Sequence, residues 1–86
     1  MMTAIRSLID RELALALPAA EIAPRADLYA LGLTSFEAVR LLLAIEREFH
    51  VELPQEMLTR ETARSIEAIV RALCALRPAE EWREAA

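Results

Sequence analysis

The sequence predicts an all-α protein, a small four-helix bundle with three principal helices and one short helix. Apolar residues recur at spacings of three and four over residues 3–17, 35–50 and 62–76, as in amphipathic helices. Prolines at positions 18, 54 and 78 separate these segments, and no strand pattern competes with them. A chain of 86 residues makes one domain. We assign residues 1–77 to this domain and residues 78–86 to a C-terminal tail.

The first expected helix, residues 3–17, places Ile5, Leu8, Ile9 and Leu13 on one face and is closed by Pro18. The following stretch, residues 18–34, contains Pro24 and Gly32 and is too interrupted for a long helix. It is also too apolar for a free linker. We therefore expect an ordered loop that closes one end of the bundle and packs these residues: Ile22, Leu28, Tyr29, Leu31 and Leu33.

The second expected helix, residues 35–50, carries two apolar lines. Its core stripe consists of Ala38, Leu41, Leu42, Ile45 and Phe49. A second line of Phe36, Val39 and Leu43 lies around the helix from this stripe. Two interpretations of it remain open: the residues fill the bundle, or they form a docking face.

After Pro54, residues 56–59 are expected to form a single helical turn. Thr62 is expected to cap the last helix, which runs to about residue 76. Its core face is Ile66, Ile69, Val70 and Leu73. We expect the tail around Trp82 to be disordered rather than docked.

Composition excludes several classes of protein. Ten arginines, no lysine and fourteen carboxylates give a net charge of −4, which opposes nonspecific nucleic-acid binding. No apolar run approaches the roughly 20 residues of a membrane span. The single Cys74 cannot form an internal disulfide, and the N-terminus does not resemble a signal sequence. We expect a soluble, cytoplasmic monomer.

Ser35 is the strongest candidate functional residue. It follows the only glycine, Gly32, by three positions and opens the most apolar helical segment. Gly32 can adopt a backbone conformation closed to other residues, and free N–H groups at a helix start favour an anion. A phosphodiester on Ser35 would be stabilised there. The alternative is an unrelated bundle in which Ser35 serves only as a helix cap.

Catalytic and metal-binding patterns do not emerge from the sequence. His50 is the only histidine and falls at a helix end, where capping is the expected role. Cys74 lies near the core face of the last helix and is expected to be a buried structural thiol. No Cys/His cluster or calcium-loop spacing suggests a metal ligand set. We expect no enzymatic activity.

The string DLYALGLTSF, followed later by ELP at residues 52–54, resembles the acyl carrier protein family over nearly the whole chain. The fold would then be an acyl-carrier-like bundle. The resemblance implies that Ser35 accepts 4'-phosphopantetheine from coenzyme A, added by a magnesium-dependent phosphopantetheinyl transferase. The arm's thiol would carry acyl groups as thioesters between a ligase and acyl-transferring enzymes. Many family members have aspartate and leucine around the serine, where this chain has Thr34 and Phe36.

The strings LTSF and MLTR resemble a bacterial subgroup of carriers that ligases charge with amino acids. Leu33 and Phe36 would receive the base of the arm. The predicted docking surface consists of Leu33, Thr34, Phe36, Glu37, Val39, Arg40, Leu43, Arg47 and Glu56.

We prefer an amino-acid cargo. The alternatives are a carrier for fatty-acid, polyketide or peptide assembly, and an unmodified bundle that binds a partner helix.

Overall fold

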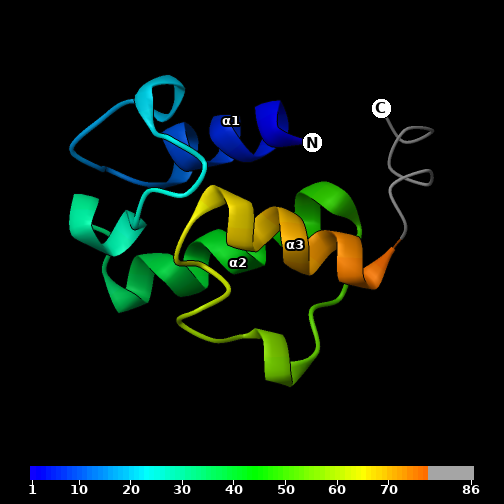
Figure 1. Cartoon of the computed structure of the whole chain (residues 1–86). Coiled ribbons are helices and arrows are strands. Elements are labelled where there is room, and N and C mark those ends of the chain that lie inside the picture. The colour runs from blue at the N-terminus through cyan, green and yellow to red at the C-terminus, as the bar shows by residue number, and fades with distance from the viewer. Residues whose placement is uncertain (78–86) are drawn as a thin grey trace.

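The computed structural model describes residues 1–77 and contains three α-helices joined by loops with single 3-10 turns (Figure 1). The α-helices are α1, Met2–Glu12, α2, Ser35–Phe49, and α3, Ile66–Leu76. The 3-10 turns are η1, Ala19–Glu21, η2, Leu28–Leu31, and η3, Gln55–Met57. No strand occurs in this part of the chain. The predicted all-α bundle is confirmed, with η3 in place of the short fourth helix. The proposed tail and Trp82 lie outside the described residues.

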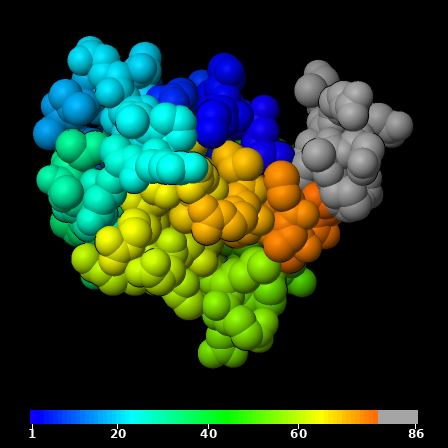
Figure 2. All heavy atoms as spheres, in the orientation of Figure 1, coloured from blue at the N-terminus to red at the C-terminus, as the bar shows by residue number. Residues whose placement is uncertain are grey.

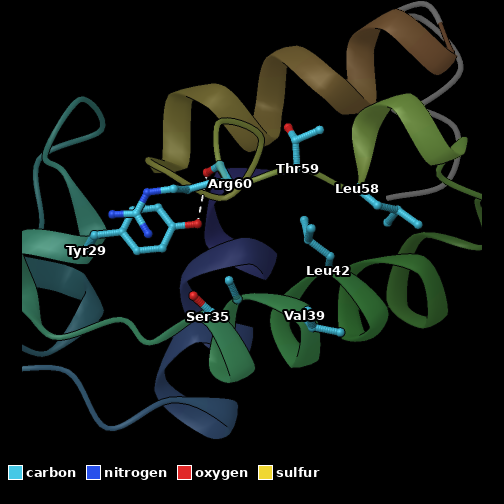
Figure 3. Close-up of a pocket in the computed structure, with 8 residues that line it drawn as sticks. Tyr29, Ser35, Val39, Leu42, Leu58, Thr59 and Arg60 are labelled. Atoms are coloured by element: carbon cyan, nitrogen blue, oxygen red, sulfur yellow. Dashed lines mark hydrogen bonds between the residues drawn. The ribbon is translucent and has the colours of Figure 1, made fainter.

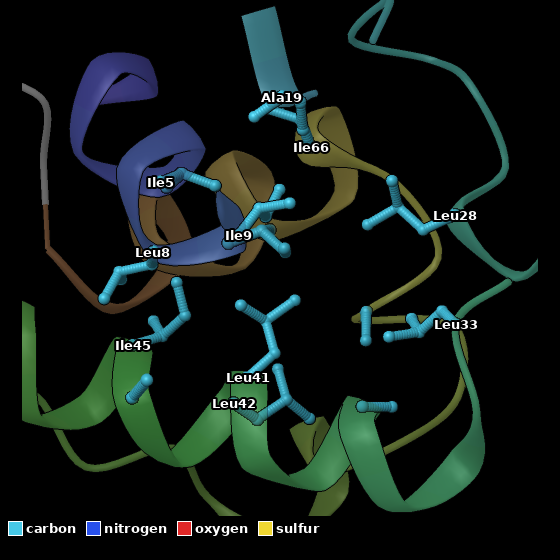
Figure 4. Packing of buried hydrophobic residues seen from close by; sticks show 14 of the residues in the cluster. Ile5, Leu8, Ile9, Ala19, Leu28, Leu33, Leu41, Leu42, Ile45 and Ile66 are labelled. Atoms are coloured by element: carbon cyan, nitrogen blue, oxygen red, sulfur yellow. The ribbon is translucent and has the colours of Figure 1, made fainter. Parts of the chain in front are cut away.

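The core forms where α1 packs against both α2 and α3. Side chains from α1 lie between those of α2 and those at the start of α3 (Figure 4). Ile5 and Ile9 of α1, Leu41 of α2 and Ile66 of α3 are at most 1% exposed. Truncating a fully buried leucine or isoleucine to alanine costs about 2–5 kcal/mol, so these contacts dominate the stability of so small a domain.

The first helix ends at Glu12, so its predicted extension to residue 17 is wrong. Leu13 has an extended backbone, and Ala16 donates its N–H to the Leu31 carbonyl (3.0 Å) instead of continuing the helix. The Asp10 carboxylate accepts the Ala19 N–H (2.9 Å). The chain therefore turns back along α1 before Pro18, because tertiary hydrogen bonds replace the helical ones.

The loop after α1 is packed, as predicted. Ile22, Leu28 and Leu33 are buried, and Tyr29 and Leu31 are half-buried. The Leu28 N–H donates to the Arg64 carbonyl (2.7 Å), which joins this loop to the segment before α3. The loop (cyan) and the residues around η3 (green) lie on opposite sides of α3 in Figure 2.

The second helix has nearly the predicted bounds, but the last helix begins later than predicted. Ser65, and not Thr62, is the N-cap of α3, because its hydroxyl accepts the Ala68 N–H (3.1 Å). Thr62 lies in the preceding turn and contacts Thr59 through their hydroxyls (3.2 Å). Within residues 1–77, no helix is long and apolar enough to cross a membrane.

Candidate functional site

Ser35 is the first residue of α2 and is exposed. Gly32 ends η2 in the left-handed region (φ 112°), where an L-residue is strained, and turns the chain toward the helix. A Cβ added to Gly32 would meet no atom within 4 Å. The glycine is therefore needed for its backbone conformation and not for space.

Thr34 and Glu37 form a capping box at the start of α2. The Thr34 hydroxyl accepts the Glu37 N–H (3.1 Å), and the Glu37 carboxylate accepts the Thr34 N–H (3.2 Å). These two predicted docking residues hold the helix start together. Threonine and aspartate both cap helices, so Thr34 keeps the cap without a carboxylate at this position.

Because Thr34 caps the helix, the Ser35 hydroxyl is not needed to hold the helix start. Neither this hydroxyl nor the backbone N–H groups of Ser35 and Phe36 form a hydrogen bond within residues 1–77. The positive end of the helix dipole and two free N–H donors favour a negative charge at this point. The alternative in which Ser35 serves only as a helix cap is excluded, because Thr34 fills that role.

A pocket of about 180 Å³ opens beside Ser35 (Figure 3). Its apolar wall consists of Ala38, Val39, Leu42 and Leu58, and its polar wall of Tyr29, Thr59 and Arg60. A second pocket of about 200 Å³ continues from it along α2 and is lined by Val39, Leu42, Leu43 and Leu58. Ser35 therefore stands at one end of a shallow groove between α2 and the loop after η3.

Tyr29 and Arg60 close the polar side of this pocket. The Tyr29 hydroxyl donates to the Arg60 carbonyl (2.9 Å), and the Arg60 guanidinium lies 3.8 Å from the centre of the Tyr29 ring. Burial raises the pKa of Tyr29 above its ordinary value, an effect that the nearby Arg60 and Arg64 oppose. Tyr29 thus stays a hydrogen-bond donor at neutral pH.

Beside Ser35, the second apolar line of α2 is exposed and does not fill the bundle. Phe36, Val39 and Leu43 are 73%, 57% and 45% exposed, and Leu58 across the groove is 47% exposed. We call these four residues the α2 apolar patch. Leu58 was not predicted, because only the fold brings the loop after η3 alongside α2.

The other predicted docking residues have different surroundings. Arg40 lies 3.3 Å from the Glu12 carboxylate of α1, while Arg47 and Glu56 are exposed. Leu33 is only 5% exposed and belongs to the core. The chain turns inward after Gly32, which leaves little of the Leu33 side chain for the predicted contact with a partner.

The remaining candidates add no chemistry. His50 is the C-cap of α2 in the left-handed conformation, and its N–H donates to the Glu46 carbonyl. Cys74 is exposed and not buried as predicted, because it lies one position around α3 from the core face of Ile66, Ile69 and Leu73. No cluster of potential metal ligands occurs within residues 1–77.

The family model described as "Phosphopantetheine attachment site" matches residues 3–73. The chain belongs to this family. Its members are carriers and not enzymes, so the predicted non-catalytic role and the covalent phosphopantetheine cofactor are confirmed at the level of the family.

Individual relatives show a more specific similarity, to aminoacyl carrier proteins and to carrier proteins solved with an amino-acid ligase. An aminoacyl carrier protein from Agrobacterium fabrum is 44% identical over 69 residues, 80% of this chain and 83% of that protein. An engineered glycine:[carrier protein] ligase from Bradyrhizobium japonicum was solved with AMP and a carrier protein from Agrobacterium tumefaciens. A chain of that complex matches with a TM-score of 0.82 and 41% identity, covering 85% of this chain and 97% of that one. A complex of the Bradyrhizobium ligase with glycylated carrier protein matches with a TM-score of 0.60 and 33% identity, covering 83% and 90%.

The residues at the start of α2 fit the family's cofactor. The exposed hydroxyl of Ser35 offers an oxygen for a phosphodiester, and the unpaired N–H groups beside it suit the negative charge. The adjoining groove offers apolar and polar surface to the base of the arm.

Proposed function

We propose that Ser35 carries 4'-phosphopantetheine and that this chain is an aminoacyl carrier, with glycine as the first candidate cargo. The observation that carries the proposal is an exposed serine hydroxyl without a structural partner at the start of α2. The amino-acid cargo is supported by the aminoacyl carrier relative, and glycine by the ligase complexes.

The attachment of phosphopantetheine would require no catalytic group from this chain. A magnesium-dependent phosphopantetheinyl transferase would supply the base, so Ser35 needs no lowered pKa. A bond forms between the Ser35 oxygen and the phosphorus next to pantetheine in coenzyme A, and the adenosine bisphosphate leaves. The bound group supplies a terminal thiol that holds an amino acid as a thioester. The chain's own residues hold the helix start rigid and keep the hydroxyl exposed.

The α2 apolar patch, Phe36, Val39, Leu43 and Leu58, would form the surface that faces the ligase. It is exposed, it is apolar, and it lies beside Ser35 along the same helix. Exposed apolar surface of this kind marks interaction sites. Arg40, held by Glu12, and Arg47 would add positive charge beside the patch, and Glu37 and Glu56 negative charge. The loaded carrier would present its cargo to acyl-transferring enzymes through the same end of α2.

We further propose that the chain is a cytoplasmic monomer, because a carrier must offer one face to successive partners. Light scattering of the modified protein should give the mass of one chain. A dimer would contradict this part of the proposal.

The attachment is tested by intact mass after incubation with coenzyme A, magnesium and a broad-specificity phosphopantetheinyl transferase. We expect the wild type to gain one phosphopantetheine and Ser35→Ala to gain none. Ser7→Ala is a matched control that removes an exposed serine from α1 and should leave the gain intact. An equal gain in Ser35→Ala would contradict the assignment. Absence of any gain with several transferases would favour the unmodified interaction bundle.

A further inference from the structure

Arg60 is the arginine that lines the pocket beside Ser35, and no carboxylate neutralises its charge within the described residues, as is also true of Arg6 and Arg47. Arg11, Arg25, Arg40, Arg64 and Arg71 each lie within 4 Å of a carboxylate oxygen. Arg60 forms no ion pair with any carboxylate of residues 1–77, although acidic residues outnumber basic ones in this chain. Its guanidinium is therefore available to an anion from outside the protein.

Tyr29 holds Arg60 at two points. The tyrosine hydroxyl donates to the Arg60 carbonyl (2.9 Å), and its ring lies under the guanidinium (3.8 Å). Tyr29 comes from η2 and Arg60 from the loop after η3. These two noncovalent contacts limit the conformations of the exposed, flexible Arg60 side chain. An arginine ordered in advance loses less conformational entropy when it binds an anion.

Ser35 and Arg60 line the same pocket of about 180 Å³; in the view of Figure 3 the Tyr29 hydroxyl lies between Ser35 and the Arg60 carbonyl, and the Arg60 guanidinium lies over the Tyr29 ring. A phosphate bonded to the Ser35 oxygen must begin at the edge of this pocket. Guanidinium and phosphate form strong, charge-assisted hydrogen bonds.

We propose that Arg60, positioned by Tyr29, binds the phosphodiester of the arm attached to Ser35. This inference rests on the proposed attachment. Arg60 would fix the base of the arm against the polar wall of the pocket, so that the arm leaves the domain in one preferred direction. The opposite apolar wall of Val39, Leu42 and Leu58 would stay open to the next part of the arm or to a partner.

The first test compares side-chain NMR resonances of the wild-type protein before and after modification, at mildly acidic pH. Intact mass establishes separately that the arm is present, so failure of attachment is distinguished from failure of this inference. We expect the Arg60 Nε–H resonance to shift on attachment and that of Arg71, an exposed arginine of α3, to stay in place. An unchanged Arg60 resonance in fully modified protein would overturn the proposal.

The second test uses Arg60→Gln, with Arg71→Gln as a matched control that removes the same charge outside the pocket. We expect modification to raise the melting temperature of the wild type and of Arg71→Gln, with a smaller rise in Arg60→Gln. Added salt should reduce the wild-type rise, because it screens an exposed pair of charges. Arg60→Lys should retain part of the rise. Equal rises in Arg60→Gln and Arg71→Gln would contradict a phosphate contact.

Discussion

Phe36→Ala should weaken loading by the cognate ligase without destabilising the fold. Phe36 is 73% exposed, and a phenylalanine buries roughly 150–250 Å² when it is fully covered. Truncation to alanine removes roughly 100 Å² of apolar surface, which is about 2.5 kcal/mol for complete burial against a partner. If Phe36 is only partly buried in a small interface, the loss of binding free energy in the transition state is about 1–1.5 kcal/mol. This corresponds to a fall of about fivefold to fifteenfold in kcat/KM.

The assay measures ATP-dependent loading of the modified carrier at concentrations below KM, together with urea unfolding of each variant. Leu17→Ala is the matched control, since Leu17 is an exposed apolar residue, 39% accessible, that lines neither pocket along α2. The free energy of unfolding should change by less than about 0.5 kcal/mol in Phe36→Ala. Equal loading of both variants would refute the docking surface, and a large loss of stability in Phe36→Ala would show that Phe36 belongs to the core.

Three further predictions concern the helix start and the surface charges. Thr34→Ala removes the N-cap of α2 and should cost about 1 kcal/mol in urea unfolding; Thr34→Asp should keep most of the stability, and an equal loss in both would contradict the capping role. Gly32→Ala should cost about 1–2 kcal/mol through its positive φ alone, since its Cβ meets no neighbour; a neutral change would show that the turn relaxes. Hydrogen bonding from Arg25 is the main cause that lowers the pKa of Glu67 below 4.5. The ionised Glu67 carboxylate therefore stabilises the fold above its pKa in the unfolded chain, and this contribution is lost as the pH falls through its lower pKa in the folded protein. Glu67→Gln lacks this contribution at every pH, so it should lose less stability in acid than the wild type.

Local patterns in the sequence predicted most of the helical framework. The spacing of Leu41, Leu42 and Ile45 identified the core stripe of α2. Phe36 and Val39 stood out as apolar residues that lie outside this stripe. Ser35 could be singled out because a glycine, a cap and an apolar helix follow one another within a few positions. These features depend on neighbours in the chain, which a sequence displays directly.

The features that were missed depend on contacts between distant segments. Helix α1 stops at Glu12, and beyond it the Ala16 N–H bonds to Leu31 and the Ala19 N–H to Asp10, which apolar periodicity cannot reveal. The Tyr29–Arg60 contact joins residues 31 positions apart. Leu33 is turned into the core by the left-handed Gly32, although its neighbours Thr34 and Phe36 are exposed. The polar wall beside Ser35 thus arises only when the two loops meet.

Loading with an amino acid tests the central claim most directly. Modified wild-type protein would be incubated with glycine, ATP and the Bradyrhizobium glycine:[carrier protein] ligase, and its intact mass measured before and after hydroxylamine, which cleaves thioesters. We expect a gain of one glycyl group that hydroxylamine removes and that Ser35→Ala never acquires. A glycyl group retained in hydroxylamine, or added equally to Ser35→Ala, would contradict a thioester carried on an arm at Ser35.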